Sequence, residues 1–387
     1  MPTLELRPKG LRRLERGHPW LFASDLRARA DTPEEPAVVD VLGARGERLG
    51  QGFYNPRSKL ALRLVTSGLE AVGPDLLEAR LRAAIRYRER VAEGFEAYRV
   101  VHADADGLPG FTVDKYADVL VYQLHAAALE PFLAGLLELL TAHYRPRGVL
   151  ARNDSGLRAL EGLPRQLEVV RGEVPEVVPY EEAGVTLFAR PFDGQKTGAF
   201  LDQRENHVYA GTLAAGRALD VFAYGGGFAL QLAGRAESVL AVDSSEGALE
   251  GVKQAAAYNG LSNVATRQGD AFETLRALYG AGERFDTVVL DPPAFAKSRQ
   301  HLAGALRGYK DINLQAMRLL KPGGRLVSAS CSQALSDEAF CAMLQDAAAD
   351  AGRSFRVLAR RGQAACHPEL LALPETHYLK LVALEAV

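Results

Sequence analysis

The stretch Leu219-Asp220-Val221-Phe222-Ala223-Tyr224-Gly225-Gly226-Gly227-Phe228 is the most informative part of this 387-residue chain. An apolar run that ends in consecutive glycines is typical of a buried strand, a tight turn and the start of a helix, where backbone N–H groups can face a ligand. A dinucleotide-binding fingerprint would need a further glycine at position 230, which is Leu230. The turn therefore indicates a nucleotide-like ligand without favouring a pyrophosphate.

Downstream of this turn, apolar runs alternate with longer helical patterns. This alternation predicts an α/β fold with a doubly wound, mostly parallel sheet, whose ligand lies at the carboxyl ends of the strands. Two later runs, 354–359 and 378–384, are expected to pair as an edge hairpin and to complete a Rossmann-like sheet of seven strands. The expected parallel strands cover residues 218–224, 238–242, 264–267, 287–290 and 326–329.

Polar side chains follow the ends of these strands. Asp243 ends the second strand, where a carboxylate can accept hydrogen bonds from both hydroxyls of a ribose. Asp270 follows the third strand and could accept from an adenine amine, although a turn or a helix cap would explain either aspartate. Asp291-Pro292-Pro293-Ala294-Phe295 follows the fourth strand, and its two prolines fix the backbone where substrate must enter. Cys331 follows the fifth strand and presents a thiol at the same edge.

Composition limits the class of protein. Hydrophobic residues make up 48% of the chain, charged residues 24%, and the net charge is -2, which excludes disordered and coiled-coil classes. No apolar stretch is long enough for a membrane span and the N-terminus has no apolar signal core, so we expect a cytoplasmic protein. The three cysteines form no C-x-x-C pair, which argues against a metal site and leaves Cys341 and Cys366 as structural residues.

The chain is expected to contain three domains. Strand-like runs at 38–42, 48–54 and 60–65, separated by turn residues, predict a small β-rich barrel or sandwich over residues 1–68. A helix at 75–96 and further alternating elements predict an α+β domain over 69–185. The Pro- and Gly-containing segment at 175–184 marks the boundary before the parallel sheet, which lies within 186–387.

Positive charge gathers near the N-terminus. Residues 1–66 contain twelve Lys and Arg against eight Asp and Glu. Such a cluster is either a solvated face or a contact for phosphates, and the sequence leaves both open. The residues concerned are Arg7, Lys9, Arg12, Arg13 and Arg16.

The strand-end residues, taken as a series, resemble those of the S-adenosylmethionine-dependent methyltransferase fold. They are more closely similar to the family of bacterial 23S ribosomal RNA cytosine-carbon-5 methyltransferases. Residues 192–204 resemble the family's segment that closes over the methionine part of the cofactor. Residues 50–56, with Ser58 and Arg63, are similar to the family's N-terminal PUA domain, an RNA-binding fold, and residues 106–114 resemble its middle domain.

This resemblance implies a role for each matched position. Cys331 and Asp291 would be catalytic, the cofactor would be S-adenosylmethionine, and the partner would be 23S ribosomal RNA or a large-subunit assembly intermediate. The oligomeric state stays open, a homodimer included. Cofactor contacts are expected from Tyr224, Gly225, Gly226, Asp243, Ser244, Asp270, Ala271, Lys196, Gly198 and Phe200, and substrate contacts from Pro292, Pro293, Phe295, Arg204 and the basic residues Arg7, Lys9, Arg12, Arg13 and Arg16.

Two positions depart from the wider methyltransferase pattern. Phe222 and Tyr224 occupy positions at which many methyltransferases have glycines. The family that this chain resembles also lacks these glycines. Other RNA cytosine-carbon-5 methyltransferases carry a cysteine after the Asp-Pro dipeptide, whereas here Pro293 and Ala294 follow. A scheme with two cysteines therefore cannot apply, and Cys331 would act alone.

The chemistry of cytosine gives a reason for a cysteine. Carbon 5 is too poor a nucleophile to attack a sulfonium methyl group until a thiolate has added to carbon 6. Asp291 could stabilise the adduct through nitrogen 3 or the exocyclic amine, and the base must be flipped or single-stranded. The group that removes the carbon-5 proton is not identified. The competing hypotheses are methylation of an exocyclic base amine, for which Asp-Pro-Pro-x-Phe would suffice, and a non-catalytic RNA binder.

Overall fold

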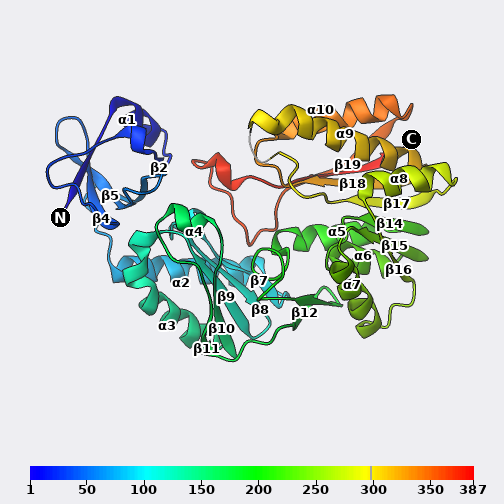
Figure 1. Cartoon of the computed structure of the whole chain (residues 1–387), viewed down its shortest axis with the longest axis horizontal. Helices are drawn as coiled ribbons and strands as arrows, with labels where there is room; N and C mark the ends of the chain where they lie inside the picture. Colours follow the sequence, from blue (N-terminus) through cyan, green and yellow to red (C-terminus); the bar gives the residue numbers. More distant parts are fainter. Residues whose placement is uncertain (297–298) are drawn as a thin grey trace. The chain divides into compact units, whose positions relative to one another are not determined.

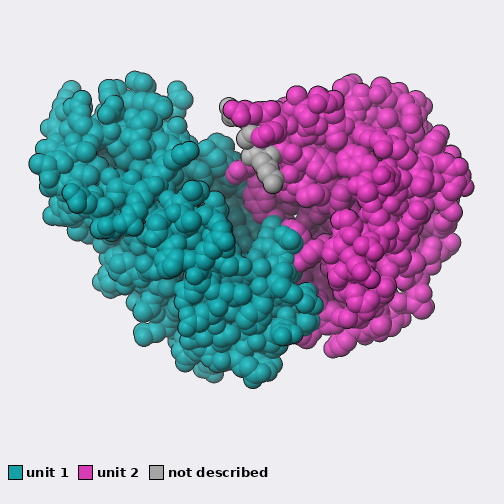
Figure 2. Space-filling view, viewed as in Figure 1, with its two compact units in different colours: residues 1–178, 189–199, 365–376 teal, residues 179–188, 200–364, 377–387 magenta. Residues whose placement is uncertain are grey.

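The computed structural model describes residues 1–296 and 299–387, and the chain divides into two compact units (Figure 2). Unit 1 contains residues 1–178, 189–199 and 365–376, and unit 2 contains residues 179–188, 200–364 and 377–387. Unit 1 thus combines the first two expected domains with two later segments. The boundaries proposed at 68/69 and 185/186 stay a proposal about independent domains.

The N-terminal part of unit 1, coloured blue in Figure 1, is built on one six-stranded sheet. The strand order is β2-β6-β5-β4-β1-β3. The pairing is antiparallel except between β1 and β4. The sequence predicts the three long strands and misses the short ones, together with α1. The elements are β1 (Thr3–Leu6), α1 (Pro8–Glu15), β2 (Trp20–Leu21), η1 (Ala23–Asp25), β3 (Leu26–Arg27), β4 (Ala37–Leu42), β5 (Arg48–Tyr54) and β6 (Leu62–Ser67).

A five-stranded sheet in the order β11-β10-β9-β8-β7 forms the second part of unit 1. Residues 127–132 form a 3-10 turn that contains Pro131, and the helix α3 begins after it, at Leu133. The elements are α2 (Pro74–Val91), β7 (Ala97–His102), η2 (Ala103–Asp106), β8 (Phe111–Tyr116), β9 (Val119–Leu124), η3 (Ala127–Phe132), α3 (Leu133–Tyr144), β10 (Gly148–Asn153), α4 (Leu157–Leu160) and β11 (Gln166–Gly172).

Glu161, at the end of α4, joins the second part of unit 1 to the N-terminal part. Its side-chain oxygens accept hydrogen bonds from Asn55 Nδ2 at 2.8 Å, Ser58 Oγ at 2.8 Å and Arg63 Nη2 at 3.0 Å. Glu161 is 5% exposed, so these charges and dipoles interact away from water. Asn55, Ser58 and Arg63 belong to the segment that resembles a PUA domain, and in the structure they anchor that segment.

Unit 2 contains the predicted seven-stranded sheet, in the order β16-β15-β14-β17-β18-β20-β19 (Figure 1). Only β20 runs antiparallel to its neighbours, and β20 and β19 form the antiparallel pair that the sequence predicts at one edge of the sheet, with β20 next to β18. β12 (Val178–Glu182) and β13 (Val185–Ala189) form a separate pair. The sheet strands are β14 (Arg217–Val221), β15 (Ser238–Asp243), β16 (Val264–Gln268), β17 (Phe285–Leu290), β18 (Leu320–Ser330), β19 (Phe355–Arg361) and β20 (Lys380–Ala386).

Helices cover both faces of this sheet. Leu219 and Val221 of β14 pack on the face that contains residues of α8, α9 and α10, whereas Ala218 packs with residues of α5, α6 and α7. Burial on both faces explains the nearly continuous apolar runs of the parallel strands. The remaining elements are η4 (Leu201–Gln203), α5 (Arg204–Leu213), α6 (Gly227–Ala233), α7 (Glu246–Tyr258), α8 (Ala271–Gly280), η5 (Arg299–His301), α9 (Leu302–Leu319), α10 (Asp337–Asp350) and η6 (Pro374–Thr376).

Among the helices that the structure describes, none combines the length and the apolar character that crossing a bilayer requires.

We expect Glu161→Ala to destabilise unit 1 by about 3 to 5 kcal/mol, because it breaks the ion pair with Arg63 in a site with little water. The chain has one tryptophan, Trp20 of β2, whose indole N–H donates to Asp104 at 2.8 Å, so its fluorescence during urea unfolding reports on unit 1. Glu173→Ala removes an exposed ion pair with Arg147 and serves as the control, with a change below about 0.5 kcal/mol. Equal transitions for the two variants would contradict the anchoring role of Glu161.

Candidate active site

Parallel pairing brings the expected site residues of unit 2 to one edge of the sheet. Val221, the last residue of β14, pairs with Leu290, and Leu290 pairs with Ser328. Since these strands run in the same direction, the segments that follow them leave the sheet on the same side. The glycine turn, the Asp291 segment and Cys331 therefore meet at one edge, as the sequence predicts.

The turn after β14 adopts a backbone conformation that glycine normally provides. Phe222 has a φ of 69°, Tyr224 of 44° and Gly226 of 87°. Residues other than glycine rarely adopt positive φ, and doing so costs of order 1 to 3 kcal/mol each. Phe222 and Tyr224 therefore adopt the positive φ that is typical of glycine, although neither residue is a glycine. Tyr224 uses its side chain as well, since its ring packs edge-on against Phe200 at 5.1 Å.

Asp243 and Asp270 both hold backbone groups. The Asp243 carboxylate accepts from the Tyr224 N–H and from the Ser245 N–H, each at 2.9 Å, which fixes it against the turn. A carboxylate has about four lone-pair positions, so Asp243 can still accept ribose hydroxyls. Asp270 caps α8 by accepting from the Glu273 N–H at 3.1 Å, the simple alternative that the sequence left open. Its adenine contact, like the contacts of exposed Ser244 and buried Ala271, stays a prediction.

Asp220, which the sequence analysis left without a role, is the most unusual group of the site. It is completely buried, and neither carboxylate oxygen has a partner of normal hydrogen-bond geometry among the described residues. Burial and the negative charge of Asp291 raise the pKa of Asp220 to about 7, although the charge of His207 and the nearby Ala229 N–H act in the opposite direction, and Asp243 raises it further. Three carboxylates gathered in this way are suited to a positively charged ligand.

The ring of His207, on α5, packs against the end of the glycine turn at Gly227. Its Nδ1 lies 2.9 Å from the buried carboxylate of Glu182, and its ring packs edge-on against Phe228 at 4.6 Å. A Cβ atom at Gly227 would lie 2.3 Å from the His207 ring, so this position must be glycine. Burial lowers the pKa of His207, but the charge and hydrogen bond of Glu182 outweigh it, and the net pKa is raised.

The Asp291-Pro292-Pro293-Ala294-Phe295 segment continues from β17. Asp291 is half-buried, Pro292 is buried and Pro293 is exposed. The ring of Phe295 packs against Tyr309 of α9, with ring centroids 4.6 Å apart. Packing inside unit 2 is the role that the structure gives Phe295, and the predicted substrate contacts of this segment stay predictions.

Cys331 follows β18 directly and is half-exposed. Its two neighbours are held by one tyrosine, because the Tyr309 hydroxyl lies 2.9 Å from both Ser330 Oγ and Ser332 Oγ. The Ser332 carbonyl accepts from the buried Lys380 Nζ at 2.8 Å. The thiol therefore projects from a turn that is fixed on both sides. Cys366 is buried and Cys341 packs against the core, as expected of structural cysteines.

The segment that resembles the family's cofactor-closing region is divided between the two units. Lys196 and Gly198 belong to unit 1, where Thr197 between them donates to Asp114 and contacts Tyr116. Phe200 and Arg204 belong to unit 2. Arg204 is completely buried and pairs with Glu205 at 3.0 Å, so a direct contact with RNA would require it to be uncovered. The cofactor contacts of Lys196, Gly198 and Phe200 stay predictions.

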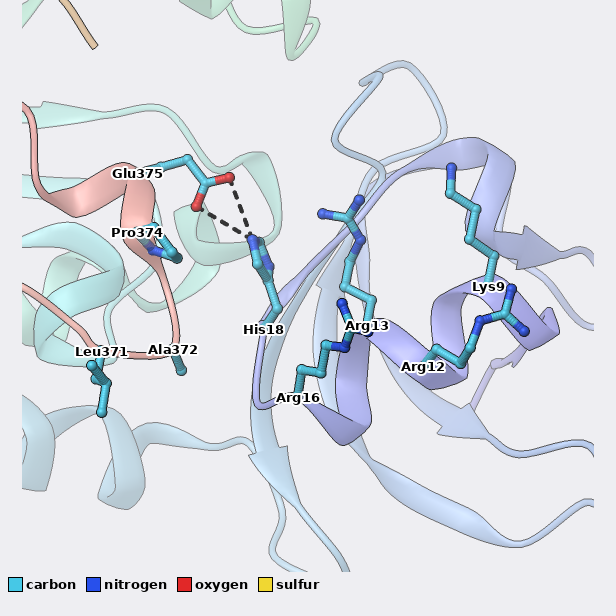
Figure 3. Close-up of a pocket in the computed structure, with 9 residues that line it drawn as sticks. All are labelled: Lys9, Arg12, Arg13, Arg16, His18, Leu371, Ala372, Pro374 and Glu375. Carbon is cyan, nitrogen blue, oxygen red and sulfur yellow. Dashed lines mark hydrogen bonds and ion pairs between the residues drawn. The ribbon is translucent and has the colours of Figure 1, made fainter. Parts of the chain in front are cut away.

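The basic cluster of unit 1 lines a pocket of about 530 Å³. One wall comes from α1 and the other from residues 371–375, and His18 is joined to Glu375 across it (Figure 3). Four of the five predicted basic residues, Lys9, Arg12, Arg13 and Arg16, line this pocket.

The five basic residues differ in how their charges are used. Lys9 and Arg13 pair with the buried Asp25, at 3.3 and 3.6 Å. Arg7 donates through Nε to the Leu26 carbonyl at 2.8 Å and is not part of the pocket lining. Arg12 and Arg16 are exposed and have no ion pair within the described part of the chain. Their two charges are therefore the most available to an anion.

The structure adds five residues that the sequence analysis did not assign. Asp220 stood in the first motif and could have been noticed as an acidic residue inside a buried strand. Glu182, His207, Tyr309 and Lys380 come from elements that carry no glycine turn or strand-end motif. Only the fold brings them to the site.

Comparison with known proteins gives consistent matches. Residues 4–67 match a family described as a PUA-like domain, and residues 214–366 match a methyltransferase domain. The chain is 39% identical to ribosomal RNA large subunit methyltransferase I of Tolumonas auensis over 394 aligned residues, covering 100% of this chain and 99% of that protein. It is 40% identical to the protein of the same name from Photobacterium profundum, covering 95% of both.

Solved structures share the fold. A Streptococcus mutans protein described as a SAM-dependent methyltransferase superimposes with a TM-score of 0.83 at 19% identity and covers 100% of both chains. A second solved chain, described as a methyltransferase complexed with SAH, gives a TM-score of 0.83 at 18% identity with the same coverage. At these identities the likeness is one of architecture.

We expect Asp220→Asn to change how stability depends on pH. The folded-state pKa of Asp220, about 7, lies above its ordinary value of 3.8. Its contribution is therefore fully present below about pH 4 and is lost as the pH rises to about 7, where the loss is on the order of 4 kcal/mol. The amide that replaces the carboxyl group does not titrate, so the stability of the variant relative to the native protein should rise over this interval and then level off.

Urea unfolding followed by far-ultraviolet circular dichroism at a series of pH values measures this difference. Asp286→Asn on β17 is the control, because hydrogen bonds from Lys321 and the Arg217 N–H outweigh burial and lower the pKa of Asp286. The contribution of Asp286 is lost as the pH falls, so its pH dependence should have the opposite sign. A stability difference for Asp220→Asn that does not vary with pH would overturn the assignment.

Proposed function

The chain belongs to the ribosomal RNA large subunit methyltransferase I family, and on that premise we propose that it transfers a methyl group from S-adenosylmethionine to carbon 5 of a cytosine in 23S ribosomal RNA. Family membership makes it a ribosomal RNA methyltransferase with S-adenosylmethionine as the methyl donor. The base and the carbon atom are the part proposed here. The observation that carries this proposal is the position of Cys331 at the end of β18, beside the strand end that presents Asp291.

The residues at the sheet edge fit S-adenosylmethionine. The buried Asp220 carboxylate has no partner of normal hydrogen-bond geometry among the described residues, and Asp291 and Asp243 add negative charge near it. S-adenosylmethionine carries a sulfonium and an ammonium group, and it supplies a methyl group bonded to the positive sulfur. We infer that Asp220 stabilises this positive charge through space from its buried position, that Asp243 holds the ribose and that the turn at 224–226 approaches the cofactor through its backbone.

Cys331 would act as the nucleophile toward the base. Its thiolate would add to carbon 6 of cytosine, which forms an S–C6 bond and makes carbon 5 electron-rich enough to take the methyl group. The bond between the methyl group and the sulfonium sulfur would break in the same step, and its electron pair would stay on the sulfur, which becomes a neutral thioether. A base then removes the carbon-5 proton, and the S–C6 bond breaks with release of the thiolate. Asp291, at the neighbouring strand end, would hydrogen-bond the polar edge of the cytosine during these steps. Pro292 and Pro293 would keep it in place, because they fix the backbone after β17.

The basic pocket of unit 1 suits the phosphates of the RNA. Exposed Arg12 and Arg16 stand beside the apolar side chains of Leu371 and Pro374 in the pocket lining. Arginine combines charge with a planar group that can bind a phosphate through two hydrogen bonds. The match of residues 4–67 to a PUA-like domain supports this placement of RNA.

Methylation of an exocyclic base amine is the second candidate. It is favoured by the Asp-Pro-Pro-x-Phe segment, which would need no thiol. Under that reaction Cys331 would be a structural residue, and its removal would leave the chemistry intact. The two candidates therefore differ in what they require of a single side chain.

We expect RNA that contains 5-fluorocytosine to form a covalent complex with the native enzyme in the presence of S-adenosylmethionine. Fluorine at carbon 5 cannot leave as a proton, so the adduct between Cys331 and carbon 6 cannot break down. A band that survives denaturing electrophoresis and contains both RNA and protein measures the adduct. Cys331→Ala should form no such complex and should lose turnover.

Cys341→Ala is the matched control, because Cys341 is also half-exposed but packs against the core. It should trap RNA and methylate it like the native protein. If Cys331→Ala methylates RNA at the native rate, the carbon-5 reaction is wrong and amine methylation takes its place.

We expect Arg12→Ala and Arg16→Ala to weaken RNA binding in a way that depends on salt. Each lost phosphate contact should reduce the slope of log affinity against log salt concentration by about 0.7 to 0.9. Fluorescence anisotropy with a 23S RNA fragment over a range of salt concentrations measures this slope. Arg45→Ala, in the turn between β4 and β5 and outside the pocket lining, is the control. Slopes equal to the control would show that the pocket does not bind phosphate.

A further inference from the structure

The buried residue Lys380 contacts the backbone next to Cys331. Lys380 is the first residue of β20, and it pairs across the sheet with Ser330, the last residue of β18. The side chain of Lys380 is 2% exposed, and its Nζ donates to the Ser332 carbonyl at 2.8 Å. The lysine thus contacts the residue that follows Cys331, whereas its strand partner is the residue that precedes it.

The acceptor of the Lys380 hydrogen bond is a backbone carbonyl, which carries no charge, so the buried ammonium group needs compensation from another group. Removing an ammonium group from water costs several kcal/mol unless nearby negative charge compensates for it. Burial lowers the pKa of Lys380, and the negative charges of Asp337 and Cys331 oppose this effect without reversing it. Asp337 begins α10, and it also pairs with the half-buried His377 at 2.8 Å.

The interaction between Lys380 and Cys331 is reciprocal. If the thiolate favours the charged lysine, the charged lysine favours the thiolate by the same free energy. A thiolate beside a lysine is a known route to a reactive cysteine. Tyr309 faces the same turn from α9, and its hydroxyl, held by Ser330 and Ser332, is neutral because burial raises its pKa. Lys380 therefore brings a positive charge to the Cys331 turn from the last strand.

We propose that Lys380 is the positioning residue of Cys331, which fixes the Ser330-Cys331-Ser332 turn from β20 and provides the positive charge that keeps the cysteine ionised for attack. The inference rests on the proposed function, in which Cys331 is the nucleophile. It goes further by assigning a role to a residue of the last strand, which contacts the turn rather than the base.

Alkylation of the full-length protein by iodoacetamide tests this assignment without RNA. The rate at Cys331 is followed by mass spectrometry of its peptide across the pH range in which thiols titrate, and Cys341 in the same sample is the internal control. Lys380→Met keeps the length of the side chain and removes its charge, whereas Lys380→Arg keeps the charge.

For Lys380→Met we expect the midpoint of the pH profile at Cys331 to move upward, with alkylation about tenfold slower near neutral pH, as for a thiol whose pKa rises by about one unit. Lys380→Arg should restore most of the native profile, and the profile of Cys341 should not change. A purely structural lysine would alter the rate at all pH values and leave the midpoint in place, and that result would overturn the proposal. Calorimetry with S-adenosylmethionine checks that the Met variant is folded.

The outcomes also separate this inference from the proposed function. If 5-fluorocytosine RNA is trapped by Cys331 while Lys380→Met has a native alkylation midpoint, the role of Lys380 is wrong and the carbon-5 reaction stands. If the midpoint moves but Cys331→Ala still methylates RNA, the charge pairing is real and the proposed function fails.

Discussion

The parallel pairing of β14, β17 and β18 is the constraint on which the site depends. Parallel strands end at the same edge, so residues that are roughly 40 to 110 positions apart in sequence become neighbours without any contact between their side chains being required. The strands themselves are held by apolar burial on both faces, through which α5 to α7 and α8 to α10 cover the sheet. The short segments after each strand can therefore carry the reactive residues, because the packed sheet stabilises the fold.

Electrostatics gives this edge its character. Glu182 with His207, together with Asp220, Asp243 and Asp291, places more negative than positive charge around the glycine turn. A low-dielectric site strengthens such charges, and groups that are already oriented need not reorganise during a reaction. Lys380 adds one positive charge on the other side of the edge, beside Cys331. The edge therefore has acidic groups near the turn and a buried basic group near the thiol.

The sequence predicts the sheet, the glycine turn and the strand-end residues because each has a local signal: an apolar run, a cluster of glycines or a polar residue after a buried strand. It does not predict β1 to β3, because strands of two to four residues carry almost no pattern. It does not predict Tyr309 or Lys380, because both lie in ordinary elements and reach Cys331 only through tertiary packing. The basic cluster was visible as charge, but residues 371–375 opposite it lie more than 350 positions away in the chain.

Unit 1 is completed by residues 365–376, which are among the last residues to be translated. In this segment the Cys366 carbonyl accepts from Arg88 at 3.0 Å and the Ala365 carbonyl accepts from Tyr87 at 3.1 Å, both from α2. During synthesis α2 leaves the ribosome almost 280 residues before these acceptors do. The N-terminal half can therefore collapse early but cannot reach its final hydrogen bonding, nor form the second wall of its basic pocket, until nearly the whole chain has been translated. Completion of unit 1 and of its basic pocket is thereby coupled to completion of the polypeptide.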